Sequence, residues 1–253
     1  MVSNRQALWK ARTEALTFLR RERPAQIEAV EQLFGLADAC IDAYEAQADD
    51  LYSKVCGLTT LKAKNLAVGM YSLTLDGLAQ EAGSLARPFI EYAELLTYFR
   101  MVPEAVTDAL AGELPNAGTR AKRIGGIYLQ FREHLNEHAS HSSYSSHSLA
   151  HLTDPTTKRI RKLQAMHPAV LERNVGDFAV LFVLMLQQSV LGLERSGDQS
   201  RVVYLAKICD ELRERILAWF PAPPAGDPVP DAPIVDMTVA VPANLASPNV
   251  GRL

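Results

Sequence analysis

Hydrophobic residues recur at intervals of three or four positions along most of the chain up to residue 220. The first segment shows this pattern, with apolar side chains at Leu8, Ala11, Ala15, Phe18 and Leu19. Such spacing places apolar side chains on one face of an α-helix. No segment shows a convincing alternation of apolar and polar residues, which would indicate a β-strand. The sequence therefore predicts an all-α fold, an irregular helical bundle.

Proline, glycine and capping residues divide this pattern into successive helices. Pro24 suits the first turn of a second helix, and we expect Gly57 to end that helix. Thr59 or Thr60 is the predicted N-cap of a third helix, and Pro88 is expected to kink or restart the chain. Further helices are predicted after residue 103 and over residues 119–138, 157–165, 169–194 and 199–219.

The helix predicted over residues 169–194 is apolar on nearly every side at its centre, which is typical of the middle of a bundle. Its longest apolar run, Phe178 to Leu186, is about half the length needed to span a bilayer. The N-terminal residues lack the apolar core of a signal peptide. We therefore expect a cytoplasmic protein without a membrane segment. Its scattered cysteines are predicted to be reduced and mostly buried thiols: Cys40, Cys56 and Cys209.

Composition changes from residue 221 onward. Eight of the 14 prolines lie in these last 33 residues, together with a single basic residue, Arg252. Such a stretch buries too little apolar surface to fold alone, so we expect a disordered, Pro-rich tail after one bundle domain over residues 1–220. A short apolar piece at residues 234–239 could dock on a partner or on the domain itself, but a solvated tail is favoured.

Charge is unevenly distributed, although the net charge is only −3. Residues 25–60 carry seven acids and one base, whereas residues 115–173 carry nine bases and four acids. The net charge gives no general electrostatic case for nucleic acid or membrane binding. Two basic segments are nevertheless candidates for binding a phosphate-bearing ligand, although a run of charge is more often a solvated face. Their residues are Arg120, Lys122, Arg123, Lys158, Arg159, Arg161 and Lys162.

All six histidines lie between residues 134 and 167, among many serines. Histidine titrates near neutrality and is the commonest metal ligand, so this region is the leading candidate for chemistry. If the helix predicted before it continues by one turn, His134, His138 and His141 share one stripe, as metal ligands could. No carboxylate or thiol joins that stripe, so surface or capping histidines are favoured, and we expect neither a metal nor a cofactor. The alternative, a metal-binding bundle, requires three of five histidines to converge: His134, His138, His141, His147 and His151.

A short motif, Arg132 followed six positions later by His138, adds another possibility. It resembles the signature of the HEPN superfamily of helical nucleotide-binding and RNase domains, although Glu133 departs from the Asn, Asp or His that commonly follows the arginine. The resemblance implies a metal-independent endoribonuclease that forms a homodimer. His138 would be the general base, Arg132 would hold the phosphate, and His134 and His141 would be auxiliary. The alternative is a helix-end arginine that pairs with a neighbouring glutamate beside a solvated histidine.

The segment that starts at Arg87 carries a second resemblance. Arg87, Glu91, Glu94 and Tyr98 share one helix face, and the segment looks like the Arg-x3-Glu helix of the DUF5677 type of uncharacterised bacterial helical proteins, over about residues 55–150. Relatives of that type are often placed near HEPN-like and phage-defence proteins, which implies a defence or toxin setting. Arg87 and Glu91 would then form a buried ion pair that orients a histidine, or a pair that only specifies the fold.

These observations give one leading hypothesis and two alternatives. The leading hypothesis is a HEPN-like, metal-independent endoribonuclease or RNA-binding protein that acts as a homodimer or with a partner protein. The first alternative is a non-catalytic helical interaction or scaffold protein, and the second is the metal-binding bundle. If the leading hypothesis is correct, Arg87, Glu91, Arg132 and His138 should lie in one cleft.

Overall fold

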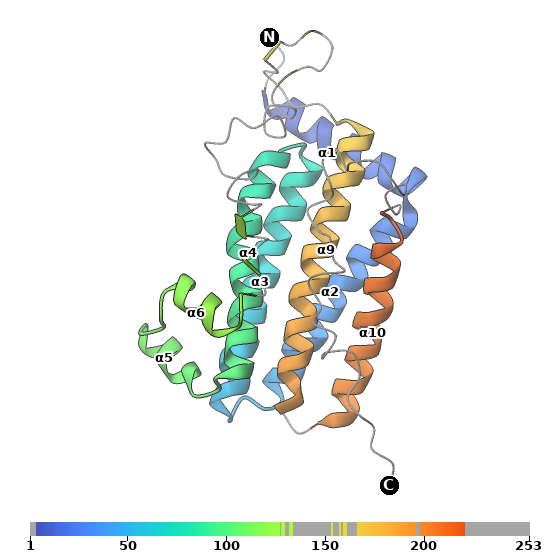
Figure 1. The fold of residues 1–253 in the computed structure, drawn as a ribbon. Helices are drawn as coiled ribbons and strands as arrows, with labels where there is room; N and C mark the ends of the chain where they lie inside the picture. Colours follow the sequence, from blue (N-terminus) through green and yellow to red (C-terminus); the bar gives the residue numbers. More distant parts are fainter. Residues whose placement is uncertain are drawn as a thin grey trace, which may run out of the picture.

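The computed structural model describes residues 4–126, 128–129, 132–133, 153, 157, 159–160, 166–195 and 198–220. Within these residues the regular structure is helical (Figure 1), apart from one isolated antiparallel bridge between Thr153 and Ile160. The prediction of an all-α helical bundle is therefore confirmed. The Pro-rich tail from residue 221 lies outside the described residues.

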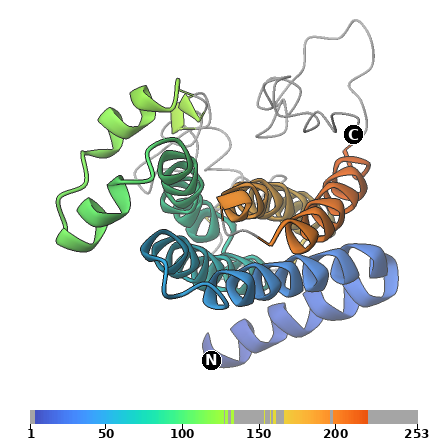
Figure 2. The same cartoon turned by 90° about the horizontal axis from the view of Figure 1, so that it is seen from below.

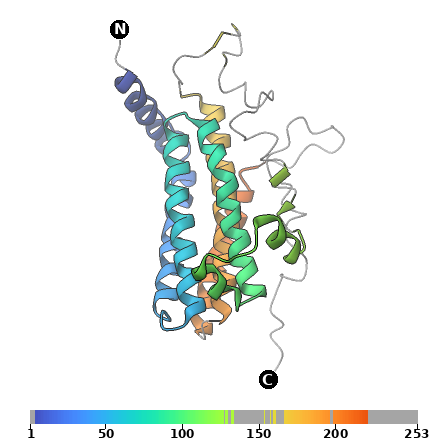
Figure 3. The same cartoon turned by 90° about the vertical axis from the view of Figure 1, so that its left-hand side faces the viewer.

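Long helices form the body of the bundle, and shorter ones lie at its side. The helices are α1 (Asn4–Glu22), α2 (Pro24–Glu45), α3 (Leu51–Leu75), α4 (Ala79–Met101), α5 (Ala105–Ala111), α6 (Ala117–Arg123), α9 (Pro168–Gly192) and α10 (Gln199–Leu217), with a 3-10 turn at Leu193–Arg195. α9 packs against α2, α3, α4 and α10 (Figure 2), and α1 contacts α2, α3 and α9 across one end of the bundle (Figure 1). α5 and α6 lie outside α4 (Figure 3).

The boundary predicted between the second and third helices is wrong. α2 ends at Glu45, and α3 already begins at Leu51, where the Asp50 carboxylate accepts a hydrogen bond from the Ser53 amide at 2.8 Å. An aspartate N-cap of this kind satisfies one of the amides that a helix leaves unpaired at its start. Gly57 consequently lies inside α3 and does not end a helix.

Thr59 and Thr60 also lie inside α3 and do not cap it. Their hydroxyls donate to the carbonyls of Val55 and Cys56, four residues earlier, at 2.8 and 2.9 Å. Both side chains are buried, so this bonding to the helix backbone satisfies hydroxyls that would otherwise be costly in the core. The two threonines that suggest a helix cap in the sequence are therefore buried residues in the interior of α3.

The helix predicted over residues 119–138 is interrupted. α6 ends at Arg123, and Gly125 and Gly126 follow with φ values of 74° and 68°. Because L side chains rarely adopt positive φ, two glycines are the residues best suited to this break. The helix predicted over residues 157–165 is also wrong where the chain is described, since Thr157 lies in a turn and Ile160 pairs in the bridge.

α9 is buried on nearly every side, as its sequence predicts. Every residue from Val175 to Leu186 is buried. By length and hydropathy alone the segment Pro168–Arg195 could cross a membrane, but 89% of its apolar window is buried inside the bundle, as in the core helix of a soluble protein.

Polar contacts fix α9 against its neighbours. The Tyr44 hydroxyl on α2 donates to the Ser189 carbonyl at 2.7 Å, and the hydroxyls of Ser189 and Thr60 lie 2.9 Å apart. All three residues are buried, so each contact satisfies a group that water cannot reach. These bonds set the position of α9 relative to α2 and α3.

The thiols belong to the same core. Cys40, Cys56 and Cys209 are all free and buried, which confirms the prediction of buried thiols. Burial raises the pKa of each thiol to about 12, because the interior disfavours a charged thiolate. Thiols of this kind are poor nucleophiles and poor metal ligands, so the cysteines serve packing.

Asp177 is an acid within the buried stretch of α9, with 8% of its surface exposed. Burial raises the pKa of its carboxyl to about 6, and the Arg173 guanidinium, 3.9 Å away, only partly opposes this shift. The folded protein therefore holds a proton on Asp177 at pH values where the unfolded chain has lost it.

Asp177 should make the protein less stable as pH rises. Its pKa is about 6 in the folded protein against an ordinary value of 3.8, so stability is lost across that window, by roughly 3 kcal/mol. Asp177→Asn should stabilise the protein by about 2–3 kcal/mol at pH 7.5 and by less at pH 4.5. Urea unfolding at both pH values measures this, with the more exposed Asp210→Asn as the control. Equal effects of Asp177→Asn at the two pH values would contradict the assignment.

Gly57 should be intolerant of a side chain, because α3 approaches α2 closely there. A Cβ at Gly57 would lie 2.9 Å from the Cβ of Tyr44, an atom that cannot move without its helix. We expect Gly57→Ala to destabilise the protein by about 1–3 kcal/mol. The matched control is Gly35→Ala, at an exposed position inside α2 with no atom within 4 Å, which should stabilise by roughly 0.5–1 kcal/mol. Urea unfolding that shifts both variants in the same direction would exclude the close-contact explanation.

Candidate functional site

α4 carries the acidic residues of the candidate site. Its apolar residues Phe89, Ile90 and Ala93 are buried, which holds this side of the helix against the core. Pro88 lies inside α4, and the helix continues through it. Glu91 and Glu94 follow within two turns, so their carboxylates leave the helix on neighbouring faces.

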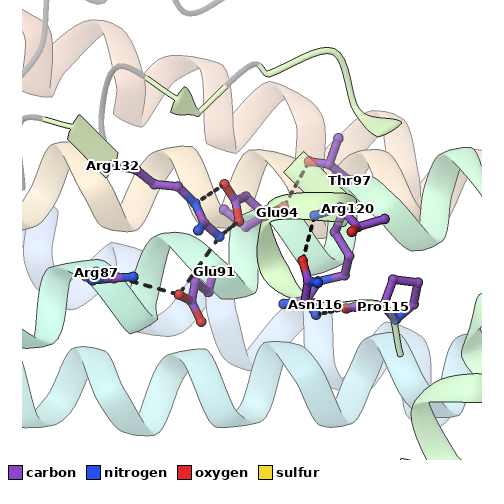
Figure 4. A network of polar contacts seen from close by, with 10 residues as sticks. Arg87, Glu91, Glu94, Thr97, Pro115, Asn116, Arg120 and Arg132 are labelled. Atoms are coloured by element: carbon purple, nitrogen blue, oxygen red, sulfur yellow. Dashed lines mark hydrogen bonds and ion pairs between the residues drawn. The ribbon is translucent and has the colours of Figure 1, made fainter. Parts of the chain in front are cut away.

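Glu94 and Arg132 form a buried, two-pronged ion pair (Figure 4). The Arg132 Nε donates to the Glu94 Oε1 at 2.6 Å, and its Nη2 donates to the Oε2 of the same carboxylate. The Glu94 side chain has no exposed surface, and only 11% of the Arg132 side chain is exposed. The hydrogen bonds with Glu94 raise the pKa of Arg132, so its guanidinium stays charged.

The ion pair extends to the surface through Glu91. The Glu91 Oε1 lies 3.9 Å from the Arg132 Nη2 and 3.8 Å from the Arg87 Nε (Figure 4). Exposure rises along this chain of charges, to 32% at the Glu91 side chain and 55% at Arg87. Three predicted site residues, Arg87, Glu91 and Arg132, therefore lie together in a network that runs from the core to solvent.

The expectation of a buried Arg87–Glu91 pair is corrected by this geometry. That pair is partly exposed, and the buried acid is Glu94, which shares the predicted helix face but is not among the predicted site residues. A signal for Glu94 was present, because it stands one turn from Ile90 and next to Ala93, both buried. A carboxylate within such an apolar stripe requires a cationic partner.

Tyr128 helps to hold Arg132 at this site. The Arg132 amide donates to the Tyr128 carbonyl at 3.0 Å, one helical turn earlier, and the Tyr128 side chain is 5% exposed. Its hydroxyl lies 3.4 Å from that of Thr97, which donates to Gln188 on α9 at 3.0 Å. Burial raises the pKa of Tyr128 to about 12, so it remains a neutral, structural group.

The histidines expected to carry chemistry fall outside this description. His134, His138 and His141 lie outside the described residues, as do His147 and His151. His167 is described, and it stands exposed immediately before α9. Among the residues that the structure describes, no three His, Cys, Asp or Glu side chains are grouped so that they could hold a metal ion.

The basic residues of α6 lie on the same side of the bundle, because α6 packs against α4. Arg120 donates to the Pro115 carbonyl at 2.6 Å, and Arg123 donates to the Tyr98 hydroxyl at 2.8 Å. Lys122 is exposed. Of the second basic segment, Arg159 is described and exposed, and its other members lie outside the described residues.

Comparison of the chain with protein-family models, with curated proteins and with solved structures gave no match. The HEPN-like and DUF5677-type resemblances therefore depend on the sequence motifs alone. The structure adds a network of charged side chains that joins α4 to the separate segment that holds Arg132.

Removing Arg132, the cation of the buried pair, should lower the free energy of unfolding far more than removing the exposed Arg87. Arg132→Met leaves the Glu94 carboxylate buried without its partner, so we expect a loss of about 3–5 kcal/mol. Arg87→Met breaks an exposed pair on the same network and should cost less than about 1 kcal/mol. Urea unfolding at pH 7 compares the two variants.

A double variant tests whether the unpaired Glu94 carboxylate causes the loss of stability in Arg132→Met. Replacing Glu94 by Gln in the Arg132→Met background removes the unpaired charge and should recover part of the lost stability. Equal losses of stability in Arg132→Met and Arg87→Met would show that the buried pair does not stabilise the fold more than the exposed pair. A double variant less stable than Arg132→Met would show that the unpaired carboxylate is not the cause.

Proposed function

We propose that this protein binds and cleaves RNA in the manner of HEPN-like endoribonucleases, without a metal ion. The observation that carries the proposal is the ion-pair network, which fixes the chain on α4 at Arg132, six residues before His138. Arg87 and Glu91 belong to the same network, so half of the six residues expected in the site already lie together. A cytoplasmic setting and a defence or toxin role belong to the same proposal.

In this proposal Arg132 positions the site and does not bind phosphate. Two of its nitrogens already donate to Glu94, so its charge is compensated within the protein. Arg87 takes the phosphate-binding role, because its side chain is 55% exposed at the outer end of the network. Its exposed contact with Glu91 is weak, so a phosphate can replace the carboxylate as its partner.

His138 supplies the general base. A neutral imidazole can take the proton of a ribose 2′-hydroxyl, whose oxygen then attacks the adjacent phosphorus. The bond from phosphorus to the 5′-oxygen of the next nucleotide breaks, and that oxygen takes a proton from His134 or His141. The products are a 2′,3′-cyclic phosphate and a 5′-hydroxyl, and Arg87 stabilises the charge that builds on the phosphate oxygens.

The charge of the neighbouring helix supports an RNA ligand. α6 packs against α4 and ends in basic residues, with Lys122 exposed. Lysine and arginine side chains that contact successive phosphates supply most of the sequence-independent affinity for nucleic acid. In this proposal RNA follows α4 from the basic residues of α6, one of which contacts Tyr98, toward Arg87.

A second candidate function is that of a helical interaction protein. It is favoured by a separate observation, since α3 exposes a row of apolar side chains although most of its other apolar residues are buried. The two functions are compatible, because α3 and the charge network are different surfaces.

The RNA proposal predicts metal-independent cleavage that requires His138. The full chain should cleave a mixed-sequence RNA in the presence of EDTA, and His138→Ala should reduce the rate by about 10²–10⁴-fold. His167→Ala is the matched control, because this histidine is exposed before α9 and has no role in the proposed site. Arg87→Ala should lower cleavage, and its effect should shrink as salt rises.

Product ends separate this mechanism from others. A 2′,3′-cyclic phosphate agrees with attack by the 2′-oxygen, whereas a 5′-phosphate product indicates attack by water. Cleavage that EDTA abolishes, cleavage that persists in His138→Ala, or the absence of both RNA binding and cleavage would each overturn the proposal.

A further inference from the structure

One side of α3 exposes apolar side chains in a regular row. Leu51, Leu58, Leu61 and Val68 are between 39% and 49% exposed, although most other apolar residues of the helix are buried. A row of half-exposed leucines costs free energy in water and marks an interaction surface more often than scattered single residues do. α3 lies at the outside of the bundle, beside α4 (Figure 3).

The spacing of this row is that of a coiled coil. With the exposed residues Lys54 and Asn65 included, the positions advance in alternating steps of three and four, and the exposed Lys62 lies at the edge of this row. Steps of this kind average 3.5 residues and keep one side chain per step facing a partner helix. We call this face the α3 stripe, and it consists of Leu51, Lys54, Leu58, Leu61, Asn65 and Val68.

The flanks of the α3 stripe are already occupied by neighbouring helices. On one side, Gly57 approaches Tyr44 of α2 and Lys64 forms an ion pair with Asp38 of α2. On the other side, a Cβ at Gly69 would lie 3.6 Å from the Leu85 side chain of α4. The stripe is therefore a ridge between two packed helices, and no other described helix covers it.

The C-terminal end of the α3 stripe lies where α1 packs against α3. Near the C-terminal end of α3, Arg12 of α1 donates to the Asp76 carboxylate at 2.5 and 2.7 Å and to the Ser72 hydroxyl at 2.6 Å. α1 thus covers the helix beyond Val68. What remains open is a length of about 26 Å, from the rise of 1.5 Å per residue.

We propose that the α3 stripe binds the α3 stripe of a second copy of the chain, in antiparallel orientation about a two-fold axis. The axis passes between Thr59 and Thr60, the midpoint of the stripe. Each residue then faces its counterpart at the same distance beyond the midpoint, so Leu58 faces Leu61 of the second copy and Leu51 faces Val68. A two-fold interface of this kind requires a surface that is complementary to itself, and the stripe meets that requirement.

The polar residues fix this choice of orientation. In the antiparallel arrangement Lys54 faces Asn65 of the second copy, and the ammonium can donate to the amide oxygen. In a parallel arrangement Lys54 would face Lys54, which brings two like charges together in an apolar seam. The antiparallel pairing therefore matches apolar with apolar and polar with polar at every step.

The size of the surface sets the expected affinity. One helix pair of this length lies at the low end of protein interfaces, where complexes are weak or transient. We therefore expect a reversible dimer with a Kd on the order of micromolar. This inference is independent of the RNA proposal, because no residue of the α3 stripe belongs to the charge network.

The first experiment measures the mass of the full chain by sedimentation velocity from low to high micromolar concentration. The expected result is a monomer that becomes a dimer as concentration rises. Leu58→Glu and Leu61→Glu should each raise the Kd by more than about tenfold, because they place carboxylates at the centre of the seam. The matched control is Val203→Glu on α10, a position that is 66% exposed and should leave the Kd unchanged. Circular dichroism shows whether each variant keeps its helices.

The second experiment tests the orientation. Asn65→Glu should lower the Kd by about two- to tenfold at low salt, because each new carboxylate faces Lys54 of the other copy. Adding Lys54→Glu to that variant should make the dimer weaker than that of the unchanged chain. A chain that stays monomeric throughout, or a dimer unaffected by Leu58→Glu and Leu61→Glu, overturns the interface. A dimer weakened by Asn65→Glu overturns the antiparallel pairing.

Discussion

The burial of α9 on nearly every side is the constraint on which the rest of the fold depends. A helix with apolar residues all round needs neighbours all round, and α2, α3, α4 and α10 supply them. Polar groups carried into this centre find partners there, as the hydrogen bonds that Tyr44 and Thr60 form with Ser189 show, whereas Asp177 is compensated only in part by Arg173. Once these four helices surround α9, only their outer faces remain available for function.

The Glu94–Arg132 pair ties the candidate functional face to this core. Glu94 has no exposed surface, so the folded protein requires a cation there, and the chain beyond α6 returns to α4 to provide it. Through Glu91 this pair reaches Arg87 at the surface. A buried interaction thereby sets the position of exposed charge, and it does so at the start of the histidine-rich part of the sequence.

The sequence predicts the bundle and its central helix well, because a 3.6-residue period and an all-round apolar segment follow directly from burial. It predicts helix ends less well. Gly57 resembles a helix end in isolation, but it is required by the close approach of Tyr44, a contact between helices that no local pattern reveals. The site shows the same limit, because Arg87 and Glu91 were recognised by their spacing within one helix. Glu94 and Arg132 are 38 positions apart and meet only through the tertiary fold.

The same physical rule governs the polar residues at the centre of the protein and those on its surface. A polar side chain within an apolar stripe has to find a partner whose polarity matches, or it weakens the contact that the stripe makes. On α4 the stripe contains Glu94, and Arg132 of the same chain provides the match. On α3 the stripe contains Lys54 and Asn65, which are exposed within the single chain. Their positions are symmetric about the middle of the stripe, so the proposed pairing with a second copy places each of them opposite the other.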